Sequence, residues 1–114
     1  MSLRILAQPY NGKASSSLSP ALVARISVTN PTRDYSAAAS LVDSSGNAVS
    51  GVIGGDYNAS GRVNDSGTEV TFKWSNLVIN HEGTYQVQIT VVECAPGGYV
   101  YAGNGLTDPV TVTA

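Results

Sequence analysis

The distribution of apolar residues along this 114-residue chain repeats with a period of two. Its clearest example runs from Tyr85 through Val87 and Ile89 to Val91, directly after a short polar turn at residues 80–83. Such alternation is typical of a β-strand with one buried side, because successive side chains of a strand point to opposite sides. No segment has a convincing helical spacing of its apolar residues. We therefore expect an all-β protein.

Other segments show the same alternation or return from a hairpin-type turn, and Gly, Pro, Asn and Ser separate them. These segments are residues 3–7, 22–28, 37–41, 48–55, 70–79 and 110–112. The stretches 11–20, 56–67 and 95–105 are expected to be loops. About seven short strands at this spacing indicate an immunoglobulin-like two-sheet antiparallel β-sandwich, with residues 1–114 as a single domain.

Three aromatic residues have expected structural roles in this sandwich. Phe72 and Trp74 alternate on one strand and are expected in the core, although Trp74 could instead be an exposed anchor for a partner. Tyr85 follows Gly83 by two residues at the entry of a strand. Immunoglobulin-like sandwiches place a corner tyrosine there, whose hydroxyl binds the backbone of the preceding loop. The cysteine pair of antibody domains is absent, because Cys94 is the only cysteine.

Charge is sparse in this sequence. Charged residues make up 12%, the net charge is −2 and the pI is about 5.0, so nucleic acids and anionic membranes exert no overall attraction. No two of the six basic residues are neighbours, and they are Arg4, Lys13, Arg25, Arg33, Arg62 and Lys73. This spacing counts against a local patch for phosphate binding.

The sequence also bears on location. Cys94 is interpreted as a small apolar strand residue, with a reactive thiol as the alternative. Gln8 and Pro9 interrupt the apolar N-terminal stretch too soon for a signal peptide, and no run reaches the length of a membrane span. We expect a soluble intracellular protein of the cytoplasm or nucleus. Secretion by another route would make the two sequons at residues 58–60 and 64–66 relevant.

Several motifs, taken in order, resemble the fungal velvet domain. They are LRILAQP at 3–9, Pro20 and Val23, SLVDSSG at 40–46, SGVIGG at 50–55, FKWSNLVI at 72–79, EGTYQVQI at 82–89 and DPVTV at 108–112. Velvet domains have an immunoglobulin-like sandwich related to the Rel-type fold. They form homodimers or heterodimers, bind DNA and govern development and secondary metabolism in the nucleus. The resemblance implies a minimal or divergent velvet-like regulator without enzymatic activity.

The chain departs from the velvet pattern where DNA binding is expected. Velvet domains carry an arginine-rich segment between the first strand and a proline-rich stretch. The corresponding residues 10–20 contain Lys13 as their only charge and Pro20 as their only proline. Without several cations, counterion release supplies little binding at physiological salt. We therefore transfer the fold and treat DNA binding as doubtful.

The sequence contains few residues in arrangements that suit catalysis. His81 is the only histidine, which excludes a site with several histidine ligands, and it lies in a polar turn beside Glu82. The glycine-rich residues 51–61 precede no helix, so they do not predict a phosphate-binding loop. We expect no enzymatic activity, no metal and no cofactor. A small hydrolase that uses His81 is the least favoured of three functional hypotheses, and the other two are given below.

Tyrosine-rich loops are the better functional signal. Apart from Tyr85, the tyrosines, including Tyr35, are expected in or beside segments rich in Gly, Ser and Asn. The candidate binding residues are Tyr99, Tyr101, Asn104, Tyr57, Asn58 and Tyr10. Tyrosine offers a rigid contact surface with a polar tip, which suits a protein partner or a glycan. The purely structural alternative is a glycine-rich hairpin whose tyrosines pack on the neighbouring surface.

Two function classes follow. The leading hypothesis is a velvet-like regulatory or protein-interaction domain that forms a homodimer or pairs with a related velvet-type chain. The second is a small fungal lectin or immunomodulatory effector that uses the tyrosine loops. The small side chains of SAAAS at 36–40 could pack closely against a second copy, or could equally belong to a thinly packed core strand.

Overall fold

The computed structural model describes residues 3–28, 33–63 and 67–114, which form strands and their connections without any helix. The strands are β1 (Leu3–Ala7), β2 (Asn11–Lys13), β3 (Leu22–Ser27), β4 (Asp34–Asp43), β5 (Ala48–Val49), β6 (Ile53–Gly55), β7 (Asn58–Arg62), β8 (Glu69–Trp74), β9 (Leu77–Ile79), β10 (Gly83–Ala95), β11 (Gly98–Leu106) and β12 (Val110–Thr113). The predicted all-β class is confirmed.

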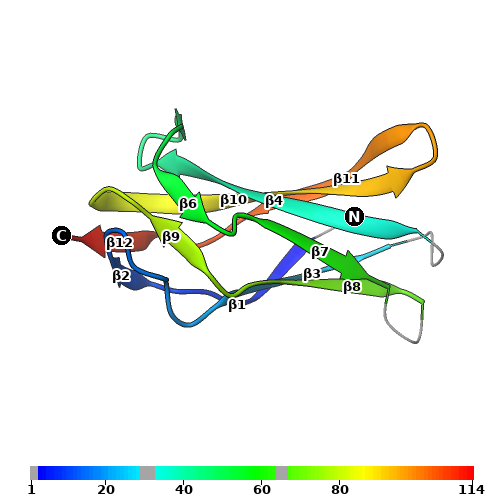
Figure 1. The fold of residues 1–114 in the computed structure, drawn as a ribbon, viewed down its shortest axis with the longest axis horizontal. Helices are drawn as coiled ribbons and strands as arrows, with labels where there is room; N and C mark the ends of the chain where they lie inside the picture. Colours follow the sequence, from blue (N-terminus) through cyan, green and yellow to red (C-terminus); the bar gives the residue numbers. More distant parts are fainter. Residues whose placement is uncertain (1–2, 29–32, 64–66) are drawn as a thin grey trace.

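The strands form two main layers (Figure 1). The smaller sheet has the order β1-β3-β8, and the larger sheet has the order β2-β12-β10-β4-β5. In the larger sheet β11 also pairs with β10, and β7 also pairs with β4, while β6 and β9 form a short ladder of their own. All of these pairings are antiparallel except the parallel pairing of β2 with β12. The arrangement is compatible with a β-sandwich.

A ladder between β4 and β10 forms the centre of the larger sheet. It joins ten residue pairs, from Tyr85 with Asp43 to Cys94 with Asp34. The other edge of β10 is shared, because β12 pairs with its beginning and β11 with its remainder. The other edge of β4 is shared in the same way between β7 and β5. Two long strands therefore position four shorter ones.

Alternating apolar side chains fill the space between the layers. Phe72 and Trp74 are 0% and 1% exposed, and their ring centroids lie 6.2 Å apart. Trp74 Nε1 donates a hydrogen bond to the Tyr57 carbonyl at 3.1 Å, so its polar atom is satisfied as well. The expected core positions of both residues are confirmed, and the exposed-anchor alternative for Trp74 is wrong.

The turn before β10 is held by Tyr85. The Tyr85 hydroxyl lies 3.2 Å from the carbonyl oxygens of both His81 and Glu82, to which it donates. A side chain at Gly83, where φ is +153°, would place its Cβ 3.0 Å from the same hydroxyl oxygen. The glycine therefore makes room for the tyrosine, and Tyr85 ties the turn to the core as its sequence position predicts.

A buried amide joins the beginning of the sandwich to its last turn. Gln8 is 5% exposed, and its Nε2 donates to the carbonyls of Pro9 and Asp108. Its Oε1 accepts from the Asp108 N–H at 2.9 Å. Beyond this contact β2 runs parallel to β12, within the stretch expected to be a serine-rich loop. The loop prediction for residues 11–20 is wrong over β2.

The loop prediction for residues 56–67 is wrong over β7. Five residues of this polar stretch pair with Asp34–Ala38 of β4. Gly61 explains how the strand fits, because a Cβ at this position would lie 2.6 Å from Val70 Cγ1 and 2.9 Å from the Thr71 carbonyl. Absence of a side chain lets β7 approach β8 closely.

The loop prediction for residues 95–105 is wrong as well. Residues 98–106 form β11, which pairs with β10 from Gln88 to Ala95. Tyr99 and Tyr101 therefore lie on a strand. Tyr35 was also expected in or beside a loop, but it lies in β4, is 2% exposed and donates its hydroxyl to Glu93 Oε1 at 3.1 Å.

Replacing Tyr85 with Phe removes the hydroxyl that holds the turn. We expect the free energy of unfolding in urea to fall by about 1 kcal/mol, because the part-buried hydrogen bonds to the His81 and Glu82 carbonyls are lost. Tyr10→Phe is the control, since Tyr10 is 56% exposed and its hydroxyl binds no described residue. Equal stability of the two variants would contradict the corner role.

Gly61→Ala tests the close approach of β7 to β8. The added methyl group meets a backbone carbonyl that cannot rotate away, so we expect a loss of about 1–3 kcal/mol of unfolding free energy. Gly97→Ala is the matched control, because a Cβ at Gly97 has no described neighbour within 4 Å. Thermal or urea unfolding measures both, and a neutral Gly61→Ala would show that β7 lies farther from β8.

Candidate functional site

The outer side of the larger sheet carries most of the candidate binding residues. Odd-numbered residues in the middle of β4 and β10, such as Ala37 and Ile89, are buried, so the even-numbered residues there point away from the core. We call this outer side the tyrosine face. It is defined by Tyr99, Tyr101 and Asn104 on β11, Thr90, Val92 and Cys94 on β10, Ser36 and Ala38 on β4, and Asn58 and Ser60 on β7.

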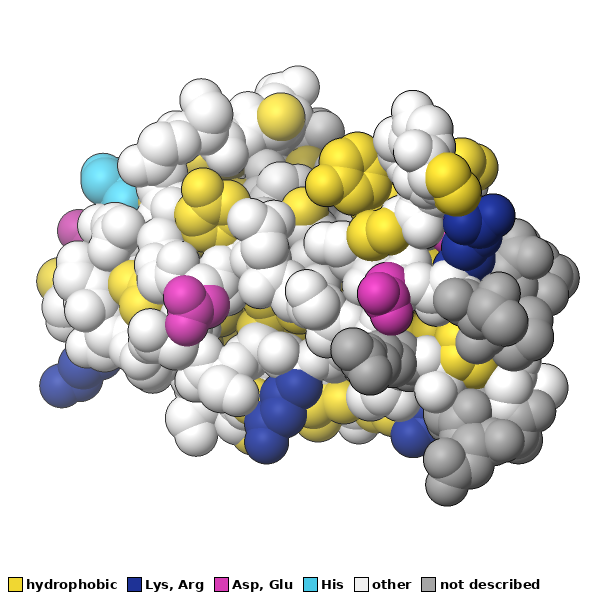
Figure 2. All heavy atoms as spheres, turned by 45° about the vertical axis from the view of Figure 1, so that its right-hand side comes forward, with side chains coloured by type: hydrophobic (Ala, Val, Ile, Leu, Met, Phe, Trp, Pro, Cys, Tyr) yellow, Lys and Arg dark blue, Asp and Glu magenta, His cyan; other side chains and the backbone are white. Residues whose placement is uncertain are grey.

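Two tyrosines dominate the tyrosine face. Tyr99 is the cross-strand partner of Cys94, and Tyr101 is the partner of Val92. Their side chains are 76% and 62% exposed and lie on one side of β11, about 7 Å apart along the strand. Figure 2 shows apolar side chains gathered on the side of the molecule where the β10–β11 hairpin lies. The hairpin thus presents a rigid aromatic pair.

A shallow hollow lies beside this pair. It measures about 450 Å³ and is lined by Asp34, Tyr35, Ser36, Ser60, Gly61 and Cys94. Cys94, the neighbour of Tyr99, connects the hollow to the tyrosines. A carboxylate and two serine hydroxyls offer hydrogen-bonding groups there. The hollow can therefore accept polar groups of a ligand or partner that contacts the tyrosines.

Two candidate asparagines share one row of the tyrosine face. Asn104 pairs with Thr90, Thr90 pairs with Ala38, and Ala38 pairs with Asn58. Three strand spacings separate the two asparagines, which corresponds to about 14 Å. They therefore flank a strip of small residues and do not form one compact site.

The remaining two candidates lie outside this face. Tyr57 is 43% exposed immediately before β7, and its carbonyl accepts from Ala39 N–H and from Trp74 Nε1–H. Tyr10 is 56% exposed beside β2, toward the opposite end of the molecule from the β10–β11 hairpin (Figure 1). The predicted set of six thus divides into four residues on one face, one at its border and one apart from it.

The SAAAS segment contributes to both sides of the sheet. Ala37 and Ala39 are 0% and 3% exposed and belong to the core, whereas Ser36 and Ala38 belong to the tyrosine face. The core-strand interpretation is therefore confirmed for Ala37 and Ala39, and packing of the outward residues against a second copy stays a prediction. The outward half of this segment gives the tyrosine face a flat centre with short side chains.

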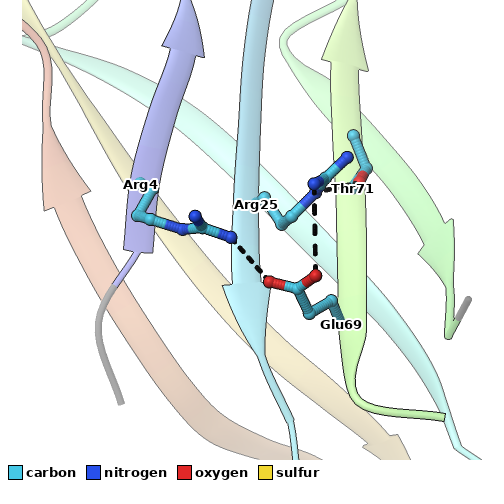
Figure 3. Close-up of polar contacts among 4 residues, drawn as sticks. All are labelled: Arg4, Arg25, Glu69 and Thr71. Atoms are coloured by element: carbon cyan, nitrogen blue, oxygen red, sulfur yellow. Dashed lines mark hydrogen bonds and ion pairs between the residues drawn. The ribbon is translucent and has the colours of Figure 1, made fainter. Parts of the chain in front are cut away.

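The opposite side of the molecule gathers basic residues that are far apart in the sequence. Arg4 and Arg25 are cross-strand partners on the outer side of the smaller sheet, and exposed Lys73 lies on the adjacent β8. Glu69 lies 2.6 Å from Arg4 and 4.0 Å from Arg25, and Arg25 also donates to Thr71 (Figure 3). Strand pairing, and not adjacency in the sequence, creates this cluster, so the spacing of the basic residues along the chain did not indicate it. The carboxylate of Glu69 offsets part of the positive charge of this cluster.

The residues considered for catalysis stay apart. His81 is exposed in the turn before β10, and its Nδ1 lies 2.9 Å from the Glu82 carbonyl. Among the described residues, no group of three or more His, Cys, Asp or Glu side chains could hold a metal ion. A helix of the length and apolarity needed to cross a membrane does not occur in the described part of the chain.

Comparisons with known proteins add no assignment. No protein-family model matches this sequence, and no curated protein is significantly similar to it.

Glu69→Gln tests how much the charge cluster on the smaller sheet contributes. Arg4 and Glu69 side chains are 57% and 27% exposed, so we expect a loss below about 1 kcal/mol that shrinks in concentrated NaCl. Lys73→Gln serves as control, because Lys73 makes no ion pair with a described residue. Urea unfolding at low and high salt measures both variants. A salt-independent loss above about 2 kcal/mol would contradict a surface ion pair.

Proposed function

We propose that this chain is a non-enzymatic binding domain that engages a protein partner through the tyrosine face. The observation that carries this proposal is the exposure of Tyr99 and Tyr101 on one side of a paired strand. Tyrosine is enriched in protein interfaces because it buries a large area with few rotatable bonds. A strand fixes the backbone of both residues, so binding costs less ordering than binding by a loop would.

The surroundings of the tyrosines support a protein partner. Ser36, Ala38 and Ser60 carry short side chains, which let another surface come close to the sheet. Val92 is apolar and half-buried between them and Tyr101. An aromatic edge next to a flat strip of small residues matches the mixture of anchors and close contacts found in specific interfaces.

The proposed domain class is an immunoglobulin-like sandwich of velvet type. Three features support it. Tyr85 occupies a corner position with its hydroxyl on the preceding turn. β1 pairs in the smaller sheet, whereas β2 crosses to the larger sheet and runs parallel to β12. The sequence motifs that resemble velvet domains occur in the same order along the chain.

A protein partner is favoured over nucleic acid by the charge distribution. Glu69 pairs with Arg4 and Arg25 in the basic cluster of Arg4, Arg25 and Lys73, which lies on the other side of the molecule from the tyrosine face. Weak net positive charge provides little counterion release. The expected partner is a second copy or a related velvet-type chain.

A glycan is the second candidate ligand, because the hollow beside the tyrosines favours it. Asp34, Ser36 and Ser60 line this hollow, and Tyr99 lies next to its Cys94. Tyrosine rings can pack on the apolar faces of pyranoses while carboxylate and hydroxyl groups bind sugar hydroxyls. On this reading the chain would be a small lectin.

The double replacement Tyr99→Ser with Tyr101→Ser tests the tyrosine face. We expect it to weaken binding at least about tenfold, since hot-spot tyrosines contribute more than 1 kcal/mol each. Self-association is measured by sedimentation velocity, sugar binding on a glycan array, and DNA binding with short duplexes at low and physiological salt. Tyr10→Ser is the control, because Tyr10 is equally a surface tyrosine but lies away from this face.

Each result of this screen has a defined meaning. Self-association that the double variant loses and Tyr10→Ser retains supports the protein-binding domain. Glycan binding with the same pattern supports the lectin instead. DNA binding at physiological salt that the double variant retains would overturn the choice of face and direct attention to Arg4 and Arg25.

A further inference from the structure

The outer half of β11 is an edge strand that lacks a second neighbour. Residues 98–101 pair with β10 on one side, and no described strand pairs with their other side. Tyr99, Val100 and Tyr101 are 76%, 53% and 62% exposed. Their free backbone groups therefore face solvent, at the end of the β10–β11 hairpin away from the smaller sheet (Figure 1).

The inner half of β11 packs against β1 through its core-facing side. A Cβ at Gly105 would lie 2.7 Å from Leu3 Cδ2, so β1 packs directly against this part of the strand. Between the two halves the register shifts opposite Val91 and Val92, and Ala102 is the unpaired residue. The bulge thus separates the half of β11 that packs against β1 from the open segment, residues 98–101.

The open segment lacks the features that usually prevent edge pairing. Soluble proteins protect edge strands with charged side chains or with proline. Residues 95–106 contain no Asp, Glu, Lys or Arg, and Pro96 lies in the turn before β11. Tyr and Val are also among the residues that favour strands most strongly. This edge is therefore suited to accept another strand.

We infer that a second copy of this chain occupies the edge, with the two β11 strands antiparallel about a two-fold axis at Val100. The inference rests on the proposed function, since it names the partner of the tyrosine-bearing hairpin. Tyr99-Val100-Tyr101 reads the same in both directions. A two-fold axis requires that if one residue contacts another, the reverse contact also forms. Tyr99 opposite Tyr101 of the second copy, and Tyr101 opposite Tyr99, satisfy this requirement.

The side chains agree with this pairing. Tyr99 of each copy lies opposite Tyr101 of the other, and Val100 lies opposite its own copy. Directly opposed residues of antiparallel strands share one side of the sheet. All four tyrosines therefore meet on the tyrosine face and form aromatic cross-strand pairs, without any charge to oppose them. β4, β10 and β11 of both copies become one continuous sheet, with an interface at the small end of the range for specific complexes.

Opposed charges at Val100 test the two-fold axis. Val100→Lys and Val100→Glu each place like charges opposite one another, so we expect either variant alone to sediment as a monomer at concentrations where the wild type dimerises. An equimolar mixture places Lys opposite Glu and should restore the dimer. Leu6→Lys is the matched control, because Leu6 is a comparably exposed apolar residue on β1, and it should dimerise like the wild type. Circular dichroism verifies that each variant is folded.

The possible failures separate this inference from the proposed function. Persistence of the dimer in Val100→Lys, together with its loss in Tyr99→Ser/Tyr101→Ser, would overturn edge pairing and leave binding by the tyrosine face intact. A mixture of the two charged variants that stays monomeric would overturn the two-fold axis at Val100. A wild type that stays monomeric at the highest soluble concentration would overturn edge pairing. The proposed function would fail only if Tyr99→Ser/Tyr101→Ser also left the binding of every other ligand tested unchanged.

Discussion

The ten-residue ladder between β4 and β10 is the constraint on which the rest of the structure depends. It gives both strands their buried and exposed sides, because alternate residues of each must enter the core. It also provides edges for strands that the sequence did not predict, such as polar β7 and glycine-rich β11. The core and the tyrosine face are therefore two sides of the same pair of strands. A change of register by one residue would exchange them.

Sequence patterns predicted the strands that bury large apolar side chains. Val87, Ile89 and Val91 alternate without interruption, and so do Phe72 and Trp74, because one side of each strand has to be apolar. The turn geometry at Tyr85 was also predictable, since glycine two residues before a strand-entry tyrosine has a steric reason. In these segments the local sequence pattern and the tertiary structure favour the same residues.

The strands that the sequence did not predict owe their conformation to their neighbours. β7 contains Asn58, Ser60 and Gly61, which disfavour strands individually, but the edge of β4 supplies its hydrogen bonds. The same holds for glycine-rich β11 beside β10. Tyr35 and the basic cluster were missed for a related reason. Tyr35 meets Glu93, and Arg4 meets Arg25, only through strand register. Neither meeting can be read from sequence proximity.

The buried Gln8 amide has a consequence for how the protein folds. Its partner Asp108 lies 100 positions further along the chain, and β2 pairs with β12 over a similar separation. During synthesis these contacts must wait until β12 has left the ribosome, because β12 is made last of the strands described. Contacts of such high sequence separation slow folding. Until they form, β2 and the chain around Gln8 lack their partners at the β12 edge of the larger sheet, and nascent chains are then open to chaperones and to aggregation.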